Sequence, residues 1–245
     1  MQKIVDLSTK NSLWADPQWY VEEQFSGLQV TVTVTPTHNM IEANGDKIHH
    51  SFHQYREAKL YDALKYSVFT GVLTAPEGLG RKYIKTLIDS GVMGAERLQR
   101  ENGEIRLVLT DVMMLGGVDF SGFKFKDRRI YLESMSSLLL ERGLVPSVVI
   151  SDIIKTDKQQ FYDFICDRGA RGVILKDSNG TVEDKVFKVA TKQAGKGVGN
   201  VTLTKNWQSL EKKIEPLEEF DYDSYLAVQF LNQPRNELKL SSVVA

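Results

Sequence analysis

The sequence lacks the features that would place it in a membrane or in an oxidising compartment. It has a single cysteine, Cys166, so no internal disulfide can form, and we expect that thiol to be buried and inert. No run of about 18 apolar residues and no signal-peptide pattern occurs, which predicts a soluble protein of the cytoplasm with no membrane partner. The formal net charge is only -1, so any nucleic-acid-binding surface has to be a local patch.

The 245 residues contain enough apolar side chains, 42% of the total, for one large domain or two small ones. Strict alternation of apolar and polar residues over 28–35 predicts a strand with one buried face, and the apolar run 105–114 predicts a buried strand. Helices are predicted over 53–66, over 79–90, from a cap at Asp127 to about 142, from the capping box Thr156-x-x-Gln159 to Gly169, and near 223–232. Alternating strands without a regular strand–helix–strand order favour an α+β fold.

Seven short blocks, in order along the chain, resemble the motifs of the covalent nucleotidyltransferases, the family of ATP-dependent DNA ligases, RNA ligases and capping enzymes. Residues 171–176 read Arg-Gly-Val-Ile-Leu-Lys, which is similar to the family's Glu-Gly-Val-Val-Leu-Lys. The other blocks are 19–27, 42–45, 69–73, 107–113, 127–133 and 186–190. The resemblance covers roughly residues 18 to 192. It implies a ligase-like adenylyltransferase domain, with antiparallel sheets flanked by helices around a cleft.

This resemblance also predicts how the chain is divided. We expect residues 1–192 to form the ligase-like nucleotidyltransferase domain. Family members normally continue into an OB domain, a five-stranded barrel. Residues 193–245 are too few for that barrel, so we expect a C-terminal tail with a short strand and a helix instead.

The family's nucleophile signature, Lys-x-Asp-Gly, reads Gln24-Phe25-Ser26-Gly27 in this chain. In the family, the lysine amine attacks the α-phosphate of the nucleotide, and a carboxamide nitrogen has no usable lone pair for that attack. No lysine occurs between Lys10 and Lys47, so a small shift of register does not supply one. The resemblance therefore implies a degenerate motif, Gln24, Ser26 and Gly27, with no catalytic residue. Gly27 is explained by the fold alone.

Positions that the resemblance assigns to metal, ribose and base have changed as well. Arg171 stands where the family has a glutamate that helps to bind metal, Val72 where it has another glutamate, and Thr110 where it has a base-stacking aromatic residue. Phosphoryl transfer depends on positioning and on neutralisation of charge by metal and lysines. We therefore expect no metal site and no cofactor; ATP and magnesium belong only to an active alternative.

Several charged positions nevertheless match the family. The resemblance makes five of them candidates for nucleotide or phosphate binding: Glu22, Arg128, Arg129, Lys176 and Lys188. Each also has a plainer interpretation as a charge on the surface. A loop rich in lysine and glycine adds candidates for nucleic-acid binding, Lys185, Lys192 and Lys196, although a solvated loop explains them equally well.

Three functions stay open at this point. The first is a catalytically inactive pseudoenzyme that acts as a nucleic-acid-binding or protein-binding module. The second is an active ATP-dependent nucleotidyltransferase with a displaced nucleophile, such as Lys47 or Lys59. The third is a structural component of a virion or complex. Compact ligases are common in large DNA viruses, so the resemblance suggests a viral protein, located in that case in the host cytoplasm.

Overall fold

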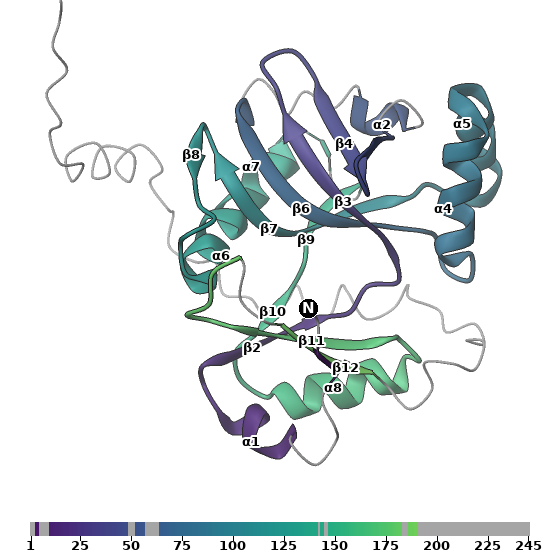
Figure 1. Cartoon of the computed structure of the whole chain (residues 1–245). Coiled ribbons are helices and arrows are strands. Elements are labelled where there is room, and N and C mark those ends of the chain that lie inside the picture. The colour runs from purple at the N-terminus through teal and green to yellow at the C-terminus, as the bar shows by residue number, and fades with distance from the viewer. Residues whose placement is uncertain are drawn as a thin grey trace, which may run out of the picture. The chain divides into compact units, whose positions relative to one another are not determined.

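The computed structural model describes residues 3–4, 10–48, 52–56, 64–141, 143–144, 147–182 and 186–190. The chain divides into two units, Met1–Thr202 and Leu203–Ala245, and the described residues all belong to the first. The predictions made for the tail 193–245 and for Lys185, Lys192 and Lys196 lie outside the described residues. Within the first unit, two β-sheets lie one above the other in Figure 1, with helices at their sides and on the lower sheet's outer face.

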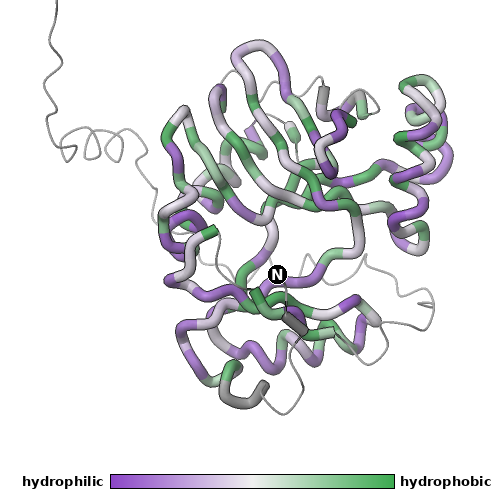
Figure 2. Tube along the Cα trace, viewed as in Figure 1, coloured by the Kyte–Doolittle hydropathy of each residue, from purple (hydrophilic) through white to green (hydrophobic). Residues whose placement is uncertain are grey.

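The larger sheet has seven strands. Its order is β5 (Asp46–Lys47), β4 (Asn39–Ala43), β3 (Gly27–Val34), β6 (Ser67–Thr74), β7 (Arg106–Leu115) and β8 (Val118–Asp119), with β9 (Val148–Ile150) paired parallel to β7. Neighbours along the main path are antiparallel. The strands predicted over 28–35 and 105–114 are confirmed as β3 and β7. Apolar and polar residues alternate along β3 (Figure 2), and its apolar residues are buried.

The smaller sheet has five strands and is built from distant parts of the chain. Its order is β1 (Lys3–Ile4), β12 (Phe187–Ala190), β11 (Gly172–Asp177), β2 (Trp19–Glu23) and β10 (Ile153–Ile154). All of these pairings are antiparallel except β1 with β12. Residues of the first ligase-like block, in β2, and of the last two blocks, in β11 and β12, thus meet in one sheet.

Seven helices are described: α1 (Lys10–Ala15), α2 (His53–Arg56), α4 (Gly80–Asp89), α5 (Gly91–Asn102), α6 (Phe125–Ser134), α7 (Ser136–Glu141) and α8 (Lys158–Asp167). Helix α8 covers one face of the five-stranded sheet, where its Tyr162 and Ile165 pack against Val21, Val173 and Leu175. Helices α4, α6 and α7 contribute to the larger core on the seven-stranded sheet. No helix among the described residues is long and apolar enough to span a membrane.

Both predicted helix caps are wrong, and tertiary contacts explain one of them. Helix α6 begins at Phe125, two residues before Asp127, because the amides of Phe125 and Lys126 donate to the carbonyls of Gly180 and Ser178. The carbonyls of a distant loop therefore accept hydrogen bonds from helix N-terminal amides that would otherwise need a capping side chain. Helix α8 begins at Lys158 after Asp157, which has the left-handed φ of 50° and makes no capping hydrogen bond through its side chain.

Candidate functional site

The stretch 24–27, which the resemblance aligns with the nucleophile signature, lies where the chain crosses from one sheet to the other. Strand β2 ends at Glu23 in the five-stranded sheet, and β3 begins at Gly27 in the seven-stranded sheet. Between them, the amide of Gln24 donates to the carbonyl of Gly172 at 2.8 Å. A Cβ on Gly27 would lie 2.0 Å from the carbonyl oxygen of Leu73, so only glycine fits there. Backbone geometry thus accounts for the one signature residue that remains.

Strand register places three of the candidates on one face of the five-stranded sheet. Tyr20 pairs with Lys176, and Ile174 pairs with both Glu22 and Lys188. Because paired residues share a face and faces alternate along a strand, Glu22, Lys176 and Lys188 all point away from α8. They face the side on which the seven-stranded sheet lies (Figure 1).

Glu22 and Lys176 form an ion pair at the centre of this arrangement. Lys176 Nζ lies 2.8 Å from Glu22 Oε2, and the Glu22 side chain is only 1% exposed. The same amine donates to the Thr110 carbonyl on β7 at 3.3 Å and lies 4.7 Å from the centre of the Phe125 ring. Lys176 therefore links the two sheets. The interpretations of Glu22 as a solvated surface charge and of Lys176 as a solvated strand tip are wrong.

Arg128, on α6, is held by a carboxylate of the larger sheet. Its Nε and Nη2 donate to the two carboxylate oxygens of Asp111 at 2.9 and 2.8 Å, which is the bidentate geometry that makes such pairs strong. The guanidinium also lies 5.6 Å from the centre of the Phe125 ring. The side chain is 2% exposed, so its interpretation as plain surface charge is wrong.

Arg129 connects α6 to Glu22 through a serine. Its Nη1 donates to Ser151 Oγ at 3.1 Å, its Nη2 donates to the Ser151 carbonyl, and its Nε contacts Glu133 at 2.6 Å. The Ser151 hydroxyl in turn donates to Glu22 Oε1. Arg129 is buried as well, which again contradicts the surface interpretation. Ser151 carries no sequence signal, because it follows a short strand without any recognisable motif.

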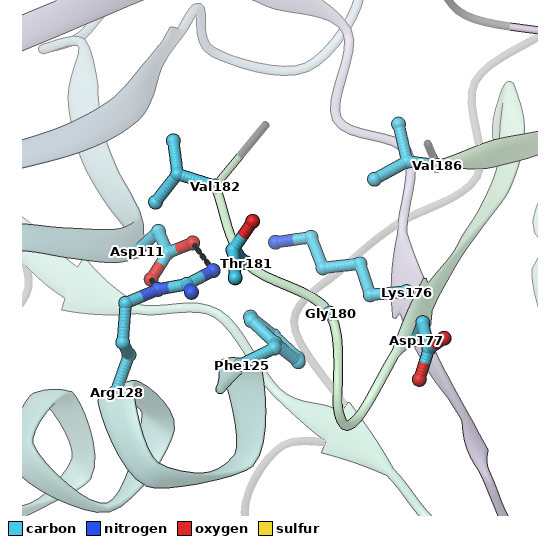
Figure 3. Close-up of a pocket in the computed structure, with 9 residues that line it drawn as sticks. All are labelled: Asp111, Phe125, Arg128, Lys176, Asp177, Gly180, Thr181, Val182 and Val186. Atoms are coloured by element: carbon cyan, nitrogen blue, oxygen red, sulfur yellow. Dashed lines mark hydrogen bonds and ion pairs between the residues drawn. The ribbon is translucent and has the colours of Figure 1, made fainter. Parts of the chain in front are cut away.

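A small cavity of about 60 Å³ adjoins these pairs. Figure 3 shows Lys176 extending toward Thr181, and Arg128 paired with Asp111, around this space. Phe125 and Val182 supply apolar parts of its lining. The two cations beside this cavity, Lys176 and Arg128, are therefore each already paired with a carboxylate.

Lys188 stands apart from this network. Burial, and secondly the positive charge of Arg171, lower the pKa of Lys188 below its usual range. Thus Arg171, at the position where the family has a metal-binding glutamate, places a cation near Lys188. Within the parts of the chain that the structure describes, no three His, Cys, Asp or Glu side chains gather in a way that could hold a metal ion.

No protein-family model matches this sequence, and no curated protein is similar enough to count as a match. Solved structures do match. The ligase domain of M. tuberculosis LigD aligns with a TM-score of 0.54 at 20% identity, over 77% of this chain and 56% of that one. The ATP-dependent DNA ligase of bacteriophage T7, solved with ATP, aligns with 0.52 at 14%, over 77% and 67%. A Lig E DNA ligase aligns with 0.52 at 13%, over 78% and 68%.

These similarities confirm the predicted fold class. The described part of the chain has the fold of the nucleotidyltransferase domain of ATP-dependent DNA ligases, with antiparallel sheets and flanking helices. The chain spans little more than half the length of the LigD ligase domain. Identities of 20% or less establish this fold alone.

Proposed function

We propose that this chain is a ligase-like pseudoenzyme, which does not transfer nucleotides and acts as a binding module for nucleic acid. The observation that carries the proposal is Gln24, at the crossover where the ligase signature has its nucleophilic lysine. Its backbone amide keeps the structural bond to Gly172. Its side chain has no amine whose pKa the surroundings could lower, so it cannot attack a phosphate.

The residues present do not fit an ATP–magnesium group. Val72 and Arg171 occupy positions where the family has carboxylates, so the donor set that magnesium prefers is missing. The charges of Lys176 and Arg128 are already neutralised by Glu22 and Asp111. The cavity beside them, about 60 Å³, is far below the roughly 300–1,000 Å³ of typical ligand pockets.

A displaced lysine nucleophile has less support. Lys47 lies exposed on β5, the outermost strand of the seven-stranded sheet, while the cavity is lined from β7. Four strand spacings separate β5 from β7, which is on the order of 19 Å. Lys59 lies outside the described residues.

Nucleic acid is the partner that the fold favours. The similar Lig E structure is described as DNA binding with a minimal scaffold. A net charge of -1 does not draw the whole molecule to a polyanion, so binding requires a local surface. A purely structural role, for example in a virion, is the alternative that predicts no binding to nucleic acid.

The test has two arms. The chain is incubated with ATP or GTP labelled at the α-phosphate, with Mg²⁺ or Mn²⁺, beside an active DNA ligase as control, and intact mass is measured. We expect no adduct; a covalent nucleotide would overturn the pseudoenzyme. The second arm measures nucleic-acid binding across a salt series, where log K should fall linearly with log salt concentration. Absence of binding to any nucleic acid would overturn the binding module and favour the structural role.

A further inference from the structure

We propose that Tyr66 and Lys65 form a contact surface for single-stranded nucleic acid, with a base stacked on the Tyr66 ring and a backbone phosphate beside Lys65. This proposal rests on the proposed function for the class of partner. It places the contact at the end of the seven-stranded sheet where β6 begins, away from the Glu22–Lys176 network.

The backbone of Tyr66 is the first observation. Its φ is 63°, in the left-handed region that bulky side chains rarely adopt. Two long-range hydrogen bonds hold it there: the Tyr66 amide donates to the Val34 carbonyl at 2.7 Å, and the Gly117 amide donates to the Tyr66 carbonyl at 2.8 Å. The conformation is thus fixed by β3 on one side and by the β7–β8 turn on the other. Glycine or asparagine would take this conformation at lower cost.

The second observation is that the Tyr66 ring makes few packing contacts with the rest of the fold. Tyr66 is 54% exposed, and it makes no ring–ring or cation–ring contact with the described residues. The neighbouring turn has glycines at 116 and 117, so it offers no side chain against Tyr66, whose Cβ lies 3.9 Å from where a Cβ on Gly117 would be. A residue that strains its own backbone without a compensating contact is expected where the side chain serves function.

The third observation is the charge of the surroundings. Residues 35–38, 64–66 and 115–118, the segments next to Tyr66, contain no acidic side chain, and Lys65 is exposed among them. Asp119, the first acidic residue beyond the β7–β8 turn, accepts a hydrogen bond from the Ser121 amide. Figure 1 shows the β3–β4 and β7–β8 turns at the same end of the sheet. Among the described residues, the segments next to the ring therefore carry one cation, Lys65, and no carboxylate before Asp119.

An exposed aromatic ring beside a lysine suits an unpaired strand better than a duplex. A single-stranded base can stack on the ring whatever its identity, while the lysine attracts the backbone. In a duplex the base faces are covered by their neighbours, so the ring would find no partner there. A protein partner would bury the same ring without needing the cation.

The experiment measures fluorescence anisotropy of a labelled oligothymidylate of 15 nucleotides with the full chain, over a salt series. Tyr66→Gly should weaken binding about 5- to 150-fold, the range expected for one stacked base, and leave the salt slope unchanged. Tyr66→Phe keeps the ring and should bind like the parent. Lys65→Gln should reduce the slope of log K against log salt by about 0.7, the share of one phosphate contact. Met93→Ala, at an 85% exposed position on α5, is the matched control and should change nothing.

Tyr66→Gly removes backbone strain, so its unfolding midpoint should be no lower than that of the parent, and loss of binding cannot then be attributed to unfolding. Parent-like binding by Tyr66→Gly would overturn this surface and leave the proposed function standing. Binding of duplex but not of single strands by the parent would do the same. If the parent binds no nucleic acid of any kind, both the surface and the proposed function fail.

Discussion

Replacing Lys176 with methionine tests whether its amine balances the buried charge of Glu22. Glu22 is 1% exposed and has Lys176 as its ion-pair partner at 2.8 Å, so the substitution leaves a buried carboxylate without its cation. Breaking a buried pair in this way costs about 3–5 kcal/mol of unfolding free energy. The bond from Lys176 to the Thr110 carbonyl is lost as well, which places the effect toward the upper end of that range, at about 4–5 kcal/mol.

The double variant Glu22→Gln/Lys176→Met separates the pair from its surroundings. With the carboxylate neutralised, no uncompensated charge stays buried, so we expect most of the loss to be recovered, to within about 1–2 kcal/mol of the parent. Urea unfolding followed by tryptophan fluorescence gives both free energies, provided that the slope against urea is unchanged. Lys82→Met, on the exposed side of α4, is the control and should stay within about 0.5 kcal/mol of the parent.

Two results would refute this reasoning. If Lys176→Met is as stable as the parent, the amine does not balance Glu22 and is available for another ligand. If Glu22→Gln/Lys176→Met recovers none of the stability lost in Lys176→Met, the buried charge of Glu22 does not cause that loss. Either result would also remove one support of the pseudoenzyme proposal, because Lys176 would then be available to contact phosphate.

Four further outcomes follow from the described contacts. Gln24→Lys alone should give no covalent nucleotide by intact mass after incubation with ATP and Mg²⁺, because the metal carboxylates are still missing; an adduct would show that the rest of the site is competent. Asp111→Asn should lower the unfolding free energy in urea by about 3 kcal/mol, since Arg128 keeps its burial and loses its anion. Burial lowers the pKa of Lys158, so its contribution to stability should rise as pH climbs toward 10.5, and Lys158→Met should flatten that rise in urea titrations at several pH values. Tyr66→Gly should change stability by between about 0 and +1.5 kcal/mol, because relief of about 1–2 kcal/mol of strain is offset by about 0.5–1 kcal/mol of chain entropy; a clear loss by thermal unfolding would contradict it.

The sequence predicted the parts of the fold that follow from local pattern. The alternation over 28–35 and the apolar run 105–114 mark their strands because burial of one or both faces dictates those patterns. The resemblance added the ligase-like fold, which the solved structures bear out. It did so because motif order survives even when individual residues change.

The roles of the charged residues could be assigned only once the pairing of the strands was known. Glu22 and Glu23 look equivalent in the sequence, yet one faces Lys176 in the interior and the other contacts Arg168 Nη2 at 2.6 Å on the opposite face. Arg128 and Arg129 likewise read as a surface pair until α6 places them against Asp111 and Ser151. No local pattern encodes which strand lies beside which, so these partners could not be predicted.

The crossover between the sheets has a consequence for how this scaffold can change over time. Its path depends on the hydrogen bond from the Gln24 backbone amide to the Gly172 carbonyl. It also depends on the absence of a Cβ at Gly27, which leaves room for the Leu73 carbonyl. The side chains at 24 and 26 make no hydrogen bond or ion pair with the described residues. Chemistry can therefore be removed from this position, or introduced there by a designer, without rebuilding the architecture that surrounds it. Selection for shape and selection for reactivity act here on different atoms.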